Sequence, residues 1–335
     1  MTAMTPEKAM SDKEMVAAAE RALAEISAIR KSVGQVIFGQ ESVVERALVA
    51  VLAGGHALLV GVPGLAKTKL VDTLGTVLGL DANRVQFTPD LMPSDILGSE
   101  VMEQDEKGRR SFRFIPGPIF AQLLMADEIN RASPRTQSAL LQSMQEYHVT
   151  VAGARHDLPA PFHVLATQNP LEQEGTYPLP EAQLDRFLLQ IDILYPELEA
   201  ERRVLIETTG AEETTAGNVL TAERLREIQT LIRRMPVPES VVEAILNLVR
   251  AARPGGGDAD IDRHVSWGPG PRASQALTLC ARARALYDGR LAPSVDDIRA
   301  LAEPVLQHRM ALSFAARAEG MSVRDVIARL AKDKV

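Results

Sequence analysis

The chain of 335 residues is longer than most single domains, so its length predicts two domains on one polypeptide. Hydrophobic residues make up 46% of it and charged residues 24%, which excludes collagen-like, coiled-coil and intrinsically disordered chains. The formal net charge of -7 excludes a general attraction to nucleic acid or anionic membranes, although a local basic loop could still provide one. Cys280 is the only cysteine, which rules out an intrachain disulfide or cysteine metal cluster and favours a reducing compartment.

The amino-terminal segment indicates a cytoplasmic protein. Residues 1–15 alternate charged with small residues and lack the apolar core of a signal peptide. The most apolar stretch, 47–60, is interrupted by Gly54, Gly55 and His56 and is shorter than the roughly 18 residues that a membrane helix needs. It is therefore interpreted as a helix, a turn and a strand, and no membrane insertion is expected.

The first part of the chain alternates between helices and strands. An amphipathic helix is predicted after Ser11, with apolar positions at helical spacing as far as Ile29, and a second helix is predicted over 40–52. The alternation that follows predicts a five-stranded parallel sheet covered by helices on both faces, an α/β fold. The predicted strands are 57–60, 84–87, 122–126, 162–167 and 188–191.

Two longer segments interrupt this alternation. Residues 88–119 contain several prolines and glycines around a predicted short hairpin. Residues 147–161 are predicted to form a second hairpin, with its turn near Gly153. Insertions of this length in a compact domain are usually functional loops or disordered excursions.

Beyond Glu197 the strand patterns end and helical patterns replace them. Residues 253–258, with Pro254 and three glycines, are predicted to be a flexible connection. The sequence therefore predicts an α/β domain over 1–210 and a smaller all-helical domain over 211–335. The predicted helices of the second domain are 222–233, 239–250, 271–287, 295–306 and 322–330.

A glycine-rich turn stands between the strand 57–60 and a predicted helix over 70–78. Backbone N–H groups of such a loop wrap phosphates, its lysine reaches the outer phosphates, and its threonine hydroxyl can ligate Mg²⁺. The strict pattern has glycine where this chain has Ala66, so one methyl group must fit near the phosphates. The alternative is a turn with a solvated lysine, which the flanking strand and helix disfavour. The turn reads Gly61-Val62-Pro63-Gly64-Leu65-Ala66-Lys67-Thr68 and is followed by Lys69.

Two adjacent carboxylates, Asp127 and Glu128, end the apolar run 123–126. Successive side chains of a strand point in opposite directions, so one carboxylate can attend the Mg²⁺ shell while the other faces an attacking water. That division suits hydrolysis. The alternative is that the pair marks the point where a buried strand meets solvent, and the presence of the phosphate loop favours the catalytic interpretation.

Three further polar residues are candidates for the site. Asn169 follows a strand at the edge where ligands bind in parallel sheets, and it either holds the hydrolytic water or forms a turn before Pro170. Arg186 either pairs locally with Asp185 or projects to a neighbouring subunit's phosphate, and the pattern leaves these two equal. Arg272 lies in the first turn of a helix, where a cation opposes the helix dipole unless an anionic ligand is present. A solvated surface arginine is the alternative there.

Taken in chain order, the motifs resemble the AAA+ ATPases and, within them, the MoxR group. The resemblance covers roughly residues 36–329. It implies that 88–119 is the insertion in helix 2 and that 147–161 is the hairpin before the sensor strand. Ala66 departs from the general phosphate-loop pattern but is typical of the MoxR group. The segments that carry the resemblance are 61–68, 86–90, 93–98, 127–131, 166–170, 179–187 and 268–272.

The resemblance also implies roles for single residues. ATP would be held by the whole Walker A loop with Lys69, and by an adenine-pocket edge that contains Gly39 and Gln40. Mg²⁺ would be held by Thr68 of Walker A and Asp127 of Walker B. The residues implied in catalysis are Glu128 of Walker B, Asn169 as sensor 1, Arg186 as the arginine finger and Arg272 as sensor 2.

The family implies a ring, expected to be a hexamer, because an arginine finger supplied in trans completes each site only when subunits adjoin. ATP is expected at the junction of the α/β core and the helical lid. Arg131 and Arg135, just after Walker B, could also cross an interface, and the sequence does not choose between them. The implied role is chaperone-like remodelling or activation of a client protein or metalloenzyme complex, with a von Willebrand A-domain protein as a candidate partner.

Three rival functions remain at this point. A magnesium-chelatase-type subunit shares the ring, both insertions and the sensors, and the sequence does not separate it. A nucleic-acid motor is supported only by the basic residues of 88–119, and the net charge argues against a nucleic-acid partner. An inactive nucleotide-binding scaffold is disfavoured because Glu128 is present. The basic residues are Lys107, Arg109, Arg110 and Arg113.

Overall fold

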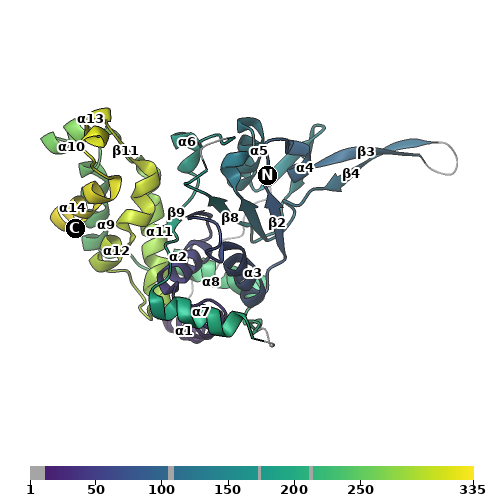
Figure 1. Ribbon diagram of the computed structural model, residues 1–335. Coiled ribbons are helices and arrows are strands. Elements are labelled where there is room, and N and C mark those ends of the chain that lie inside the picture. Colours follow the sequence, from purple (N-terminus) through teal and green to yellow (C-terminus); the bar gives the residue numbers. More distant parts are fainter. Residues whose placement is uncertain (1–11, 105–108, 173–174, 211–213) are drawn as a thin grey trace.

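A central sheet of five parallel strands forms the core of the protein (Figure 1). The structure is a computed structural model that describes residues 12–104, 109–172, 175–210 and 214–335. The strand order β2-β5-β8-β1-β9 confirms the predicted parallel sheet. The strands are β1 (Ala57–Val60), β2 (Ala82–Gln86), β5 (Leu123–Asp127), β8 (His163–Gln168) and β9 (Leu189–Asp192).

Alternate residues of the central strands face two separate hydrophobic cores, as the period of a strand requires. Leu58 and Leu124 pack on one side of the sheet with residues of helix α5 (Pro134–Glu146). Leu59 and Leu165 pack on the other side, with helices α1 (Asp12–Gly34), α2 (Glu41–Leu52) and α3 (Lys67–Leu78). Helix α5 begins where Ser133 accepts a hydrogen bond from the Thr136 N–H and proline occupies the first helical position.

Both predicted hairpins are present. Helix α4 (Pro93–Leu97) leads into β3 (Gly98–Gln104) and β4 (Arg110–Pro116), an antiparallel hairpin that projects far from the body of the protein (Figure 1). Strands β6 (His148–Val151) and β7 (Ala154–Asp157) form the second hairpin. Its turn contains Gly153 with a φ of +83°, a conformation that glycine adopts without strain.

The carboxyl-terminal region is mainly helical, as predicted, but it also contains a two-stranded antiparallel ribbon that the sequence analysis missed. Its strands are too short to give an alternating pattern. The ribbon consists of β10 (Val265–Trp267) and β11 (Ala311–Leu312). The helices are α8 (Ala222–Arg234), α9 (Glu239–Ala251), α10 (Ala259–His264), α11 (Pro271–Tyr287), α12 (Val295–Leu306), α13 (Phe314–Ala318) and α14 (Val323–Lys334), with a 3-10 turn over Gln307–Arg309.

One helix between the two regions, α7 (Leu198–Thr208), was also missed by the sequence analysis. None of its residues is buried, and Leu198, Leu205 and Ile206 are exposed. Because its apolar residues do not form a stripe facing the core, the helical period is not visible in the sequence. Among the described residues, no helix combines the length and apolar character that a membrane span requires.

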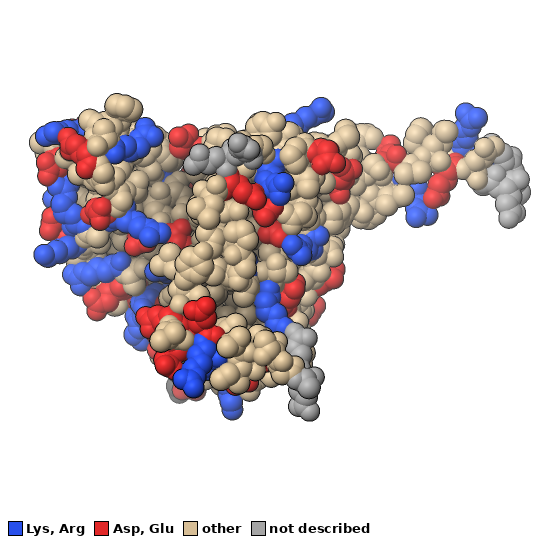
Figure 2. All heavy atoms as spheres, in the orientation of Figure 1, with Lys and Arg blue, Asp and Glu red and all other residues tan. Residues whose placement is uncertain are grey.

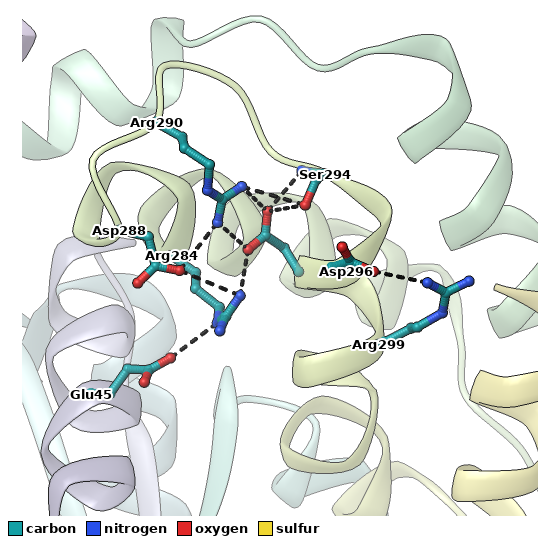
Figure 3. A network of polar contacts seen from close by, with 8 residues as sticks. Glu45, Arg284, Asp288, Arg290, Ser294, Asp296 and Arg299 are labelled. Carbon is teal, nitrogen blue, oxygen red and sulfur yellow. Dashed lines mark hydrogen bonds and ion pairs between the residues drawn. The ribbon is translucent and has the colours of Figure 1, made fainter.

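A buried carboxylate connects the carboxyl-terminal helices with the α/β core. Asp297 is fully buried and accepts hydrogen bonds of 2.6 Å from Arg284 and from Arg290. Arg284 also contacts Glu45 of α2 at 3.0 Å, so the network joins α2 to α11 and α12 (Figure 3). Burial alone would raise the pKa of Asp297, but the hydrogen bonds from Arg290, Ser294 and Arg284 hold it below its usual value.

Two buried histidines tie the amino ends of β1 and β8 to their surroundings. His56 accepts a hydrogen bond from the Val164 N–H at Nδ1, so its Nε2–H donates to the Met144 carbonyl at 3.1 Å. His163 donates from Nδ1 to the Gly55 carbonyl at 2.9 Å. Burial lowers the pKa of His56 to about 3 and that of His163 to about 4, so both rings are neutral in the folded protein.

We expect these histidines to make the folded state less stable in mild acid. The unfolded chain binds their protons below about pH 6.5, whereas the folded protein binds them only near pH 4 or below. Lowering the pH from 7 to 5 should therefore cost about 2 kcal/mol of unfolding free energy per histidine. Urea unfolding at both pH values measures this loss. The variant His163→Asn keeps a donor for Gly55 without titrating, and a pH dependence equal to that of the original protein would contradict the assignment.

Candidate functional site

The glycine-rich turn directly follows β1 and directly precedes α3, as predicted. The ammonium group of Lys67 donates to the carbonyl of Gly61 at 2.5 Å and of Val62 at 3.3 Å, so the lysine side chain lies over the loop. A Cβ atom added to Gly61 would come within 2.9 Å of the Ile193 carbonyl, which only glycine avoids. Gly64 has a φ of +84°, which turns the backbone of the loop. These features fit a backbone cradle for phosphates.

Ala66 and Thr68 lie at the point where the loop enters α3. Ala66 is exposed and has a φ of 56°, so the methyl group that replaces glycine is compatible with a left-handed backbone here. Thr68 is in the first turn of α3. Burial lowers the pKa of Lys67, while the nearby charges of Asp127 and Glu128 oppose that shift. The lysine therefore lies within electrostatic range of both carboxylates.

The two predicted carboxylates lie at the carboxyl end of β5, and each has its own set of contacts. Asp127 is buried and accepts hydrogen bonds from Thr167 at 2.5 Å and from Arg84 at 2.6 Å. Glu128 has a left-handed backbone with a φ of 55°, which turns it away from the strand direction. Its Oε2 accepts hydrogen bonds from Gln86 at 2.7 Å and Arg131 at 3.0 Å.

Three of these partners were missed by the sequence analysis. Thr167 bridges the pair, because its hydroxyl donates to Asp127 and accepts from the Glu128 N–H at 2.8 Å. Arg84 and Gln86 alternate along β2, and Gln86 lies opposite Asp127 in the sheet register. The sequence did contain a sign of the last two, because two polar residues at a spacing of two in a predicted strand point to the same face of the sheet. This sign could indicate partners for the carboxylates only once β2 was known to lie beside β5.

Asn169 is buried beside the site, one residue after β8. Its side-chain oxygen accepts a hydrogen bond from the Leu171 N–H at 3.1 Å, which is the turn that an asparagine before proline forms. The turn does not use its amide N–H₂ group. Asn169 therefore forms the turn before Pro170, and its role in holding the hydrolytic water stays a prediction.

A cavity of about 540 Å³ opens beside the phosphate loop. Gln40 lies between the two, because its amide donates to the Leu65 carbonyl at 3.2 Å while its buried Oε1 has no partner among the described residues. Gly39 has a φ of +67° and packs against Ala200 of α7, which a Cβ atom would prevent. A free buried acceptor in a mainly apolar cavity next to a phosphate cradle fits the amino group of an adenine base. The cavity is lined by residues that include Val36, Ile37, Phe38, Lys69, Val204 and Thr208.

Arg186 and Arg272 lie together, but at the opposite edge of the sheet from the phosphate loop. Arg186 shortly precedes β9, which runs parallel to β1 with Leu189 opposite Ala57. The phosphate loop follows the carboxyl end of β1, and the four residues of that strand, at 3.3 Å per residue, separate its two ends by roughly 13 Å. The two arginines line a pocket of about 240 Å³ at this amino edge.

Arg272, which the resemblance implies as sensor 2, lies apart from the cavity beside the phosphate loop of its own chain. The cavity beside the phosphate loop is lined by residues between Gln35 and Thr214, and none of the residues of α8 to α14 lines it. In the amino-edge pocket, Arg272 lies 3.9 Å from Asp185 and close enough to Arg186 to lower the pKa of that guanidinium. The sequence order alone does not reveal at which sheet edge the helix α11 begins.

The structure also distinguishes Arg131 from Arg135. Arg131 is held by Glu128 within the same chain, and that hydrogen bond raises its pKa. Arg135 is exposed at the start of α5 and has no hydrogen-bond or ion-pair partner in the described part of the chain. Of the two, Arg135 is therefore the residue available to a neighbouring molecule.

The phosphate loop follows β1, and the paired carboxylates stand at the carboxyl end of β5, which is separated from β1 by β8 in the sheet order β2-β5-β8-β1-β9. This arrangement, with the helical region that follows it, defines an AAA+ ATPase module with a helical lid. Comparison with known families agrees. Residues 56–189 match the family of ATPases associated with various cellular activities (AAA), and residues 258–330 match the AAA lid domain.

Known proteins give the family within this class. The chain is 41% identical to the chaperone MoxR1 of Mycobacterium tuberculosis, over 93% of this chain and 83% of that protein. It is 31% identical to the protein MoxR of Methylorubrum extorquens, over 84% and 86% of the two chains. A crystal structure of a proposed ATPase from Cytophaga hutchinsonii superposes with a TM-score of 0.89 at 38% identity, covering 96% of this chain and 98% of that one. The chain belongs to the MoxR family of AAA+ ATPases.

Proposed function

We propose that this protein hydrolyses ATP within a ring of identical subunits, a hexamer, and uses the cycle to remodel or activate a client protein. One observation carries the proposal. The Walker A and B residues lie at the carboxyl edge of the sheet, whereas Arg186 and Arg272 line a pocket at the amino edge. A chain with its phosphate loop and its arginines on opposite edges can complete a site only with a second copy, and repeated head-to-tail contacts close into a ring.

The residues at the carboxyl edge divide the chemistry between them. Lys67 and the loop N–H groups would hold the phosphates, and Thr68 with Asp127 would hold Mg²⁺. Mg²⁺, when bound, withdraws charge from the phosphates and so favours attack by water. Each Asp127 oxygen has one hydrogen bond and retains a second lone pair, so its contacts with Thr167 and Arg84 leave it able to accept further ligands.

Glu128 is the proposed general base. Gln86 and Arg131 both donate to its Oε2 and fix the orientation of the carboxylate. The other oxygen, Oε1, would take the proton of the attacking water. Arg186 and Arg272 of the adjacent subunit would stabilise the charge that develops on the terminal phosphate.

The client would be engaged away from this site. The β3–β4 hairpin projects from the body and exposes Met102 and Phe112, which are opposite each other in its register (Figure 1). An apolar pair on a projecting hairpin is suited to contact with another polypeptide. One relative is named a chaperone, which supports a polypeptide client. We also propose that the client is a protein or a metalloenzyme complex and that a von Willebrand A-domain protein is a partner.

The hairpin gives less support to a nucleic-acid motor. Arg113 is paired with Glu103 at 3.1 Å, and Lys107 lies outside the described residues. Acidic and basic side chains are interspersed along the visible face of the hairpin (Figure 2). A groove that follows a nucleic-acid backbone needs a continuous positive surface instead.

Replacing Arg109 and Arg110 by alanine is expected to leave basal ATP hydrolysis within about twofold of the original rate, since the hairpin lies outside the nucleotide site. Phosphate release by the purified double variant measures this. A collapse of basal hydrolysis in the folded variant would contradict the placement of the hairpin. DNA binding that weakens steeply with salt and is lost in the variant would support the motor instead.

The proposed function is tested by measuring phosphate release and particle mass together. The purified protein should release phosphate from ATP only with Mg²⁺, and light scattering should show an assembly of six chains when ATP is present. Hydrolysis by a monomer that stays monomeric at all concentrations would overturn the requirement for a second copy. A protein that binds no ATP would overturn the enzymatic proposal altogether.

A further inference from the structure

The pocket at the amino edge contains a cation that no motif accounts for. Arg233, near the end of α8, lines this pocket together with Arg186, Arg272 and Arg309. We call it the arginine pocket. Its four guanidinium groups come from four separate parts of the chain, and α8 contributes Arg233 without belonging to any nucleotide-binding motif.

The charges of the arginine pocket do not balance. Asp185 is the only acidic residue that lines it, and Arg309 already binds Asp185 at 2.7 Å. Arg272 is 3.9 Å from the same carboxylate. Within the described part of the chain, Arg186 and Arg233 have no hydrogen-bond or ion-pair partner. The pocket therefore presents an excess of positive charge to whatever enters it.

Arg186 is held there at an energetic cost. Burial lowers its pKa and the positive charge of Arg272 lowers it further, while the negative charge of Glu146 only partly opposes this shift. An arginine stays protonated at neutral pH, so the protein keeps two guanidinium groups close together although Arg186 itself has no ion pair in the described part of the chain. An anion in the pocket would remove the repulsion.

Arg233 also has a defined place at the edge of the pocket. Gly54 lies in the turn before β1 with a φ of +80°, and a Cβ atom added to it would lie 3.4 Å from Nη2 of Arg233. The guanidinium group therefore rests against the backbone of this turn. The same turn lies in the lining of the pocket beside Arg186 and Arg272.

We propose that Arg233 is a third arginine that acts across the subunit interface, where it contacts the polyphosphate of a nucleotide held by the neighbour's phosphate loop. This inference rests on the proposed function, because the phosphates reach the pocket only when two copies adjoin. Three guanidinium forks suit a ligand with several adjacent phosphate groups, since each fork can bind two oxygens. A triphosphate, with its extra charge, should depend on Arg233 more than a diphosphate does.

The test uses nucleotide affinity in a protein that cannot turn over. Arg233→Ala is introduced into the Glu128→Gln protein, and the affinities of the assembled particles for fluorescent analogues of ATP and ADP are compared. We expect the ATP affinity to fall on the order of tenfold and the ADP affinity to change by less than about threefold. Arg226→Ala is the matched control, because Arg226 is an exposed arginine of the same helix that lines the groove toward α1. It should change neither affinity.

The outcomes separate this inference from the function on which it rests. If the Glu128→Gln parent binds no ATP or forms no ring, the proposed function fails and the inference fails with it. If the parent binds ATP in a ring and Arg233→Ala has the same ratio of ATP to ADP affinity as Arg226→Ala, only the role of Arg233 is overturned. Should Arg233→Ala not assemble, Arg233→Lys keeps the charge but loses the fork. If Arg233→Lys has the same ratio of ATP to ADP affinity as the Glu128→Gln parent, the inference is equally overturned. A lower ratio of ATP to ADP affinity in that variant supports it.

Discussion

Replacing Glu128 by glutamine is expected to abolish ATP turnover while ATP binding is retained. The amide keeps the size and the hydrogen-bond acceptor of the carboxylate but cannot take a proton from water. We expect phosphate release to fall by a factor of about 10² to 10⁴, the usual contribution of a general base. Lys67→Ala should instead lose nucleotide binding, because it removes the charge that meets the phosphates. Phosphate release and equilibrium nucleotide binding, measured on both variants, separate the two defects.

Glu172→Gln is a useful control for the Glu128 variant. Glu172 is exposed, and its negative charge also acts on Lys67. It does not belong to the carboxylate pair at the end of β5, so it has no proposed part in activating water. Its replacement should reduce hydrolysis by less than about threefold, the scale of an exposed charge. If Glu128→Gln hydrolysed ATP at the original rate, the assignment of the general base would be wrong.

Replacing Arg186 by alanine is expected to have the other large effect, a loss of hydrolysis on the order of 10³-fold, as for arginine fingers in general. The reason lies in its position. Arg186 is at the amino edge, so the chain's own phosphate loop is intact in the variant and nucleotide binding by the separate subunit should be unchanged. Single-turnover hydrolysis and nucleotide affinity distinguish these effects.

The control for Arg186 is Arg317→Ala, which removes an exposed cation from the short helix α13. It should hydrolyse ATP at nearly the original rate. Particle mass must be measured for both variants, because a loss of assembly would also stop hydrolysis. An Arg186→Ala protein that forms rings and hydrolyses ATP normally would show that Arg186 has a local structural role.

The parallel sheet could be predicted because its three central strands are buried on both faces. Runs such as 57–60 and 123–126 are continuously apolar, and the phosphate loop fixes the type of element on each side of it. The carboxyl-edge residues were predictable for the same reason, since parallel strands end at one edge. Helix α7 was not predictable, because a helix with no buried residue lacks the periodic pattern that marks a helix in sequence.

What the sequence could not supply was the spatial neighbourhood of residues distant in the chain. The contacts of Thr167 with Asp127 and of Gln86 with Glu128 depend on which strands pair, and strand order is not written in any one strand. The grouping of Arg186 with Arg272 depends on where the first turn of α11 lies relative to the sheet. That placement results from packing among distant helices, and it puts Arg272 at the amino edge, apart from its own chain's phosphate loop.

The most direct test of a site shared between subunits is a mixing experiment with two inactive proteins. Arg186→Ala subunits keep an intact phosphate loop, and Lys67→Ala subunits keep an intact Arg186. A whole site is restored where the phosphate loop of an Arg186→Ala subunit faces the Arg186 of a Lys67→Ala subunit. Random equal mixing produces this arrangement at roughly a quarter of the interfaces. We predict that the mixture hydrolyses ATP faster than either parent. If mixed rings are demonstrated by energy transfer between labelled subunits and hydrolysis stays at the level of the parents, a site completed across the interface by Arg186 is contradicted.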